Sequence, residues 1–168
     1  MRSISSVNLN NAANLPNSSP SKGVLMATVS LYIGLAAVFD TRAGTITPQQ
    51  ASEILFRQAA LMRQHNQTGK VSAQTFKSEL NTAATNPSTA QPVRDRYNQM
   101  SVILEDYTIG FGFADQIAEK LISASGLILK RDQESISNLD TELNEIGLLE
   151  QQMTQVMNGI AAKAAAIR

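Results

Sequence analysis

The C-terminal part of the chain carries apolar residues at a heptad spacing. Over residues 136–167, two series of positions seven residues apart are apolar, with the exception of Glu150. Such a repeat keeps one seam of a helix facing a partner helix and predicts left-handed supercoiling. The two series are Ile136, Leu143, Glu150, Met157 and Ala164, and Leu139, Ile146, Met153, Ile160 and Ile167.

The same register continues upstream with weaker packing. It passes through Leu129 and Ile122 and reaches a Gly-Phe-Gly-Phe sequence, in which Gly110 and Gly112 predict a hinge. We therefore expect one long coiled-coil helix over residues 113–168. A flanking position widens the apolar stripe, which indicates that this helix contacts more than one neighbour. That position holds Leu121, Ile128, Leu149 and Val156.

Two core positions of this seam are charged, Asp132 and Glu150. One interpretation is that each is a frayed or solvated gap in the seam. The other is that each selects the pairing register, because a buried charge without a partner costs several kcal/mol and so penalises wrong alignments. Both interpretations stay open at the level of the sequence.

Residues 23–39 form a second apolar segment, which contains no charged residue. Alternating steps of four and three residues define one seam in it, and predict a helix over residues 22–43 that packs against partner helices. A membrane-inserting segment and a cleaved signal peptide are the alternatives. A membrane span usually needs about 20 residues, and a signal peptide places its apolar region closer to the N-terminus. The seam residues are Leu25, Val29, Tyr32, Ala36 and Phe39.

Residues 44–112 are expected to form a variable region of helices and loops. Thr47, with the proline and glutamine that follow it, has the pattern of an N-cap and capping box. We expect the helix that starts there to end at residues 65–69. Residues 81–92 are expected to be an exposed linker, because each of their two prolines disfavours helix in the residue before it.

Composition supports an all-α protein. Of the residues, 43% are hydrophobic but only 5% aromatic, and there is no tryptophan. Aliphatic side chains of this kind suit helix-on-helix packing better than a β-sandwich. We expect an elongated helical hairpin or coiled coil, with long N- and C-terminal helices and a variable, loop-containing middle region.

Charge and candidate chemistry favour no enzyme class. Fourteen basic and fourteen acidic residues cancel, so nucleic acid is not an expected partner, and the absence of cysteine excludes thiolate chemistry. His65 lies among polar residues that predict a helix end, and Asp115 and Glu119 lie one helical turn apart on an expected exposed face. We expect no catalytic site, no metal and no cofactor.

The N-terminal residues 1–21 are rich in serine and asparagine and contain no acidic residue. Such a segment buries too little apolar surface to offset the entropy of ordering, so we expect it to be disordered. Three segments together, MRSISSVNLNNAANLPNSS, GVLMATVSLYIGLAAVF and ISNLDTELNEIGLLEQQMTQVMNGIAAKAAAI, give the chain an architecture that resembles the EspA family of type III secretion filament proteins.

This resemblance implies a function. It makes residues 1–21 an export segment and the chain a building block of a hollow extracellular filament, a bacterial cell-surface appendage that conducts secreted proteins. Implied partners are copies of the chain, a cytoplasmic export chaperone and the secretion needle, while the host membrane is contacted only indirectly. Two rival functions are a membrane-inserting translocator of the same system and a cytoplasmic coiled-coil adaptor or chaperone.

The two seams differ in length. An apolar segment of 17 residues can cover only part of a helix of about 55 residues. We therefore expect the C-terminal seam to be filled partly by the chain's own N-terminal helix and partly by neighbouring copies.

Overall fold

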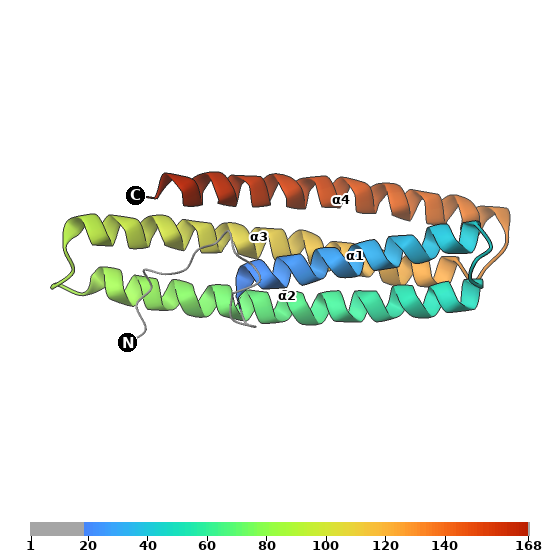
Figure 1. Cartoon of the computed structure of the whole chain (residues 1–168), viewed down its shortest axis with the longest axis horizontal. Helices are drawn as coiled ribbons and strands as arrows, with labels where there is room; N and C mark the ends of the chain where they lie inside the picture. The colour runs from blue at the N-terminus through green and yellow to red at the C-terminus, as the bar shows by residue number, and fades with distance from the viewer. Residues whose placement is uncertain (1–18, 168) are drawn as a thin grey trace.

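The computed structural model describes residues 19–167, which form an elongated bundle of four helices (Figure 1). They are α1 (Pro20–Arg42), α2 (Pro48–Thr85), α3 (Gln91–Leu127) and α4 (Gln133–Ala166). Within this described range there is no strand, and the prediction of an elongated all-α protein is confirmed. Residues 1–18, and with them most of the predicted export segment, lie outside the described residues.

Local sequence signals set the helix starts. The hydroxyl of Ser19 caps α1 by accepting a hydrogen bond from the Lys22 backbone N–H at 3.2 Å. Thr47 begins α2 with the predicted capping box, in which its side chain and that of Gln50 satisfy each other's backbone N–H groups. In the turn between these two helices, Gly44 adopts a φ of 76°, which glycine accepts without steric cost.

Successive helices run antiparallel and pack as neighbours. The backbones of α1 and α2, of α2 and α3, and of α3 and α4 approach closely, and α1 also approaches α3. The backbones of α1 and α4 do not approach closely. Figure 1 shows α1 crossing in front of α3, with the α2–α3 hairpin extending past the N-terminal end of α1.

Two adjoining apolar clusters form the core. The larger one is built on side chains of all four helices, among them Leu31, Leu55, Leu121 and Ile146, which are fully buried. The smaller one surrounds Phe111 and lies toward the N-terminal end of α1 and the C-terminal end of α4. Small residues of α1 make the close approach to α3 possible: a Cβ added at Gly34 would stand 3.3 Å from the Leu121 side chain.

The middle of the chain is more helical than the sequence predicts. The prediction that a helix ends at residues 65–69 is wrong, because α2 continues through this polar stretch to Thr85. Asn66 and Gly69 are both buried there, so tertiary packing replaces the solvent that the polar sequence suggested. The predicted linker over 81–92 shrinks to the turn between Thr85 and Gln91, and the proline at position 92 lies in the first turn of α3.

The prediction of one helix over residues 113–168 is also wrong. The chain breaks between Leu127 and Gln133, and Asp132 caps the new helix by accepting a hydrogen bond from the Ser135 backbone N–H at 2.8 Å. Ser, Asp and Asn at such a position start helices, and this local signal overrides the heptad register that runs through it. The prediction of a hinge at Gly110 and Gly112 is wrong as well, because both lie inside α3.

Candidate interaction surface

The apolar heptad positions of α4 are largely covered by the rest of the chain. One of the two predicted series faces the core: Leu139, Ile146, Met153 and Ile160 are buried, and Ile167 is partly buried. The other series lies at the edge of the buried face, where Leu143, Glu150, Met157 and Ala164 are partly buried and Ile136 is exposed. α3 packs along α4 at the centre of the predicted seam, whereas the backbones of α1 and α4 do not approach closely. The prediction that the chain's own N-terminal helix fills this seam is therefore wrong.

The flanking residues follow the same division. Leu121 and Ile128 are buried, while Leu149, Val156 and Ile122 are partly buried against the core clusters. Leu129 falls in the turn before α4 and is exposed, so it is not part of a helical seam.

The predicted seam of α1, in contrast, is exposed. All five of its predicted residues are exposed, with Tyr32 at 54% and Phe39 at 61%. The buried face of α1 is made of smaller residues on the other side of the helix, because these allow its backbone to approach α2 and α3. That face comprises Pro20, Gly23, Val24, Ala27, Ser30, Leu31, Gly34, Ala37 and Val38.

We call the exposed set the outer seam: Leu25, Val29, Tyr32, Ala36 and Phe39. No charged residue occurs over residues 23–39, and Ile33, 45% exposed, extends the apolar surface sideways. A helix that is apolar on both faces normally has both faces covered. Contiguous exposed apolar surface is a common feature of interaction sites, so the outer seam is the candidate surface of this chain.

Side chains rather than close backbone packing join α1 to α4. The Tyr32 hydroxyl donates a hydrogen bond to Glu150, and Arg42 pairs with Asp140. The hydrogen bond to Glu150, aided by the carboxylate charge, raises the pKa of Tyr32 above its usual value. Glu150 therefore has a specific partner at the edge of the seam, as a register-selecting residue would require.

Asp132 does not have the position that the sequence suggested. It is exposed and caps α4, which fits the interpretation of a solvated gap and contradicts that of a buried charge in the seam. The backbone N–H of Ser135 lowers the pKa of the Asp132 carboxyl, because this hydrogen bond favours the ionised form. Its contribution to register is local: it decides where α4 begins.

Ion pairs align the opposite edge of α4 with α3. Lys120 lies 3.2 Å from Glu142 and also pairs with Glu145, and hydrogen bonding to Glu145 is the largest cause of the raised pKa of Lys120. Lys163 pairs with Asp106 at 2.5 Å near the other end. These surface pairs contribute little stability each, and they lie along the edge of α4 that faces away from Glu150.

A buried polar group between α2 and α3 was not predicted. Asn66 is fully buried and donates a hydrogen bond of 2.8 Å to Asp115, which also pairs with Lys70. Glu119, one turn further along α3, is exposed as expected and lies 3.9 Å from Arg63, whereas Asp115 is only partly exposed. A lone polar residue can specify helix register, which is the role that this geometry suggests for Asn66.

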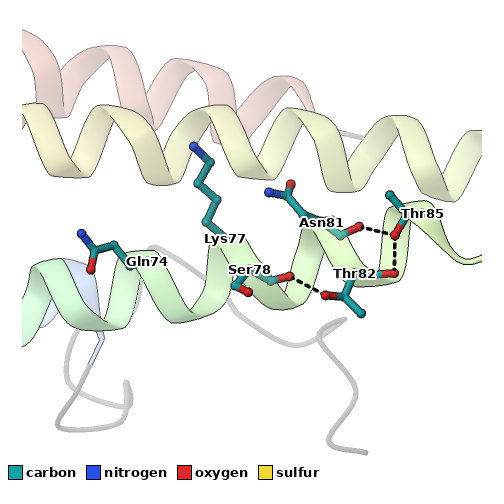
Figure 2. Close-up of a pocket in the computed structure, with 6 residues that line it drawn as sticks. All are labelled: Gln74, Lys77, Ser78, Asn81, Thr82 and Thr85. Carbon is teal, nitrogen blue, oxygen red and sulfur yellow. Dashed lines mark hydrogen bonds between the residues drawn. The ribbon is translucent and has the colours of Figure 1, made fainter.

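The described residues offer little geometry for ligand chemistry. His65 lies inside α2, and residues 19–167 contain no group of three or more His, Cys, Asp or Glu side chains suited to a metal. Figure 2 shows a shallow polar hollow whose lining comes from α2 alone. Thr82 and Thr85 there donate to carbonyl groups of their own helix, and Lys77 pairs with Glu105, so these groups do not converge on a ligand.

α1 is long and apolar enough to cross a membrane by length and composition, and 44% of its most apolar window is buried in the bundle. A partly covered core helix passes the same test.

No family model matches the chain, and neither a curated protein nor a solved structure matches it. Its function is therefore inferred from its own residues.

Proposed function

We propose that this chain is a non-catalytic structural subunit that associates with copies of itself, and that it builds an extracellular type III secretion filament. The observation that carries the proposal is the outer seam, an uncharged heptad surface left exposed on α1. The assignment to a filament rests, in addition, on the resemblance of the sequence to the EspA family. The subunit is secreted and belongs to a bacterial cell-surface appendage.

One seam is largely buried within the subunit and the other is exposed, and this difference supports assembly of folded subunits. The α4 heptads hold the subunit together, since Ile146 and its heptad neighbours are buried inside it. The outer seam is then available for contacts between subunits. Each of its large side chains is roughly half exposed, so covering one contributes about 1 kcal/mol. A cytoplasmic export chaperone that masks this surface would keep the subunit from assembling before secretion.

The central test compares a charge on the outer seam with a charge elsewhere. Val29→Asp changes an exposed residue of the outer seam, and Leu148→Asp changes an exposed residue of α4, 61% exposed, as the matched control. We expect light scattering to show assemblies for the wild type and for Leu148→Asp but monomers for Val29→Asp, with equal helicity by circular dichroism. A wild-type protein that stays monomeric at every concentration would contradict self-association.

Two further measurements address the filament itself. Electron microscopy of the assembled wild type should show tubular filaments, and compact closed oligomers would contradict this part of the proposal. Deleting residues 1–20 should abolish secretion from cells that carry the export system. Unchanged secretion would contradict the export role of this segment. A wild type that stays in the cytoplasm, with its location unchanged by the deletion, would favour a cytoplasmic adaptor.

A membrane-inserting translocator is the second candidate, favoured by the length and apolar character of α1. Liposome flotation separates the two functions. A translocator should insert strongly, and Ile33→Asp should abolish insertion. A filament subunit should stay with the unbound fraction in both forms.

A further inference from the structure

The outer seam has an uneven distribution of side-chain size. Its two aromatic residues, Tyr32 and Phe39, alternate along the helix with Val29 and Ala36. In a parallel, in-register pair of two α1 helices, each residue would meet its own copy. Ring would then face ring, and Ala36 would face Ala36 and leave a gap. Unfilled and overfilled layers both cost stability.

An antiparallel pair matches these sizes. With the helices overlapping about Gly34, Val29 of one copy faces Phe39 of the other, and Tyr32 faces Ala36. The two-fold symmetry repeats both layers, so each of the four layers places an aromatic ring against a smaller side chain. Alternation of large and small residues across facing positions is what fills a helix interface to native density. The opposed helix dipoles also favour this direction.

Charge indicates which molecule covers the seam. A partner surface must be uncharged along about three helical turns, because a charge buried there without a partner is costly. A second copy of residues 23–39 satisfies this requirement, since it has no charged residue. We propose that two copies pair through the outer seams of α1 in an antiparallel, two-fold contact; this inference rests on the self-association proposed above.

The contact has a consequence for assembly. A two-fold contact uses the same patch on both copies and closes on itself, so it cannot propagate a filament alone. The α1 pair is therefore the dimeric building unit, and a second surface joins these units. The six large side chains in these layers, Val29, Tyr32 and Phe39 of each copy, contribute about 1 kcal/mol each, against an association cost of about 4–15 kcal/mol, so the isolated pair is weak and depends on concentration.

Cysteine cross-linking tests the pairing directly, because none of the 168 residues is a cysteine. Val29→Cys and Phe39→Cys change exposed positions and should leave the fold intact, which circular dichroism melting checks. The two variants, one with an affinity tag, are oxidised separately and as a mixture. Disulfides need Cα atoms within about 7 Å, so only facing positions should link efficiently.

The expected result is a mixed disulfide between Val29→Cys and Phe39→Cys, with several-fold less product from either variant alone. Gln67→Cys, exposed on α2, serves as the control and should not link. Efficient linking of each seam variant with itself would overturn the antiparallel pairing. Linking that requires removal of residues 1–18 would assign the seam to the chain's own N-terminal segment and overturn the proposal for the full chain.

The unlinked wild type separates this inference from the proposed function. Assemblies seen by light scattering without any cross-link at positions 29 and 39 would overturn seam pairing and leave self-association standing. A wild type that is monomeric at all concentrations would overturn both.

Discussion

The ring of Phe111 in α3 lies against the backbone of Gly69 in α2, so closely that a Cβ at position 69 would stand 2.1 Å from the ring's Cζ atom. A Cβ at Gly23 of α1 would stand 3.1 Å from the same ring. Phe111 is fully buried, and three helices meet around it. This contact explains why the glycines near position 111 do not act as a hinge: the ring between them anchors α3 to the bundle.

Gly69→Ala should lower the free energy of unfolding by about 1 kcal/mol or more. Overpacking a well-filled core costs about 1–3 kcal/mol, which outweighs the gain of about 0.5–1 kcal/mol from replacing a helical glycine. Gly112→Ala is the control, because a Cβ there meets nothing within 4 Å and the substitution should be stabilising. Urea denaturation measures both, and equal stabilisation by the two would contradict the close contact.

Ile146→Ala should cost about 3 kcal/mol of unfolding free energy, since Ile146 is fully buried and truncation leaves a cavity. Leu148→Ala, two residues along and 61% exposed, should change stability by less than about 0.5 kcal/mol. Thermal and urea unfolding provide the comparison. Similar costs at both positions would mean that the seam predicted from the heptads is not the buried face of α4.

Alkaline pH should loosen the contact between α1 and α4. The pKa of Tyr32 is raised in the folded protein by its hydrogen bond to Glu150, so the protonated hydroxyl is favoured. Its stabilising effect is complete below the unfolded pKa of about 10 and is lost as the pH rises through the folded value. The difference in tyrosinate absorbance between wild type and Tyr32→Phe reports the titration of Tyr32, and its midpoint should lie above the unfolded pKa. When both proteins also carry Glu150→Gln, the midpoint should move to a lower pH.

Acid should weaken the start of α4. The folded pKa of Asp132 is lowered by the Ser135 backbone N–H, so its stabilising effect is present above the unfolded value and lost as the pH falls through the folded one. Asp132→Asn keeps a capping oxygen that does not titrate, whereas Asp132→Ala removes the cap. Melting temperatures between neutral pH and about pH 2 should therefore fall less for Asp132→Asn than for wild type. At neutral pH, Asp132→Ala should melt below both.

Part of this architecture follows from local sequence signals. The capping pattern at Thr47 predicts a helix start, and the spacing of Leu139, Ile146, Met153 and Ile160 predicts the buried face of α4. Both predictions are confirmed, because they depend on interactions within one helix or on a periodic contrast between apolar and polar positions. The break before α4 had a local signal too, the Asp132 cap, which the heptad register obscured.

The sequence by itself determined that this protein is all-α, where α2 starts, and which stripe of α4 is apolar. Only the tertiary structure decided which face of α1 turns inward. Both faces of that helix are apolar, so periodicity gives no contrast between them, and the choice depends on how closely two backbones can approach. Small residues such as Ala27 and Gly34 allow that approach, so they pack inward and leave Tyr32 and Phe39 outside. The same physical reason places Gly69 beneath Phe111, a contact between residues far apart in the chain that local patterns do not encode.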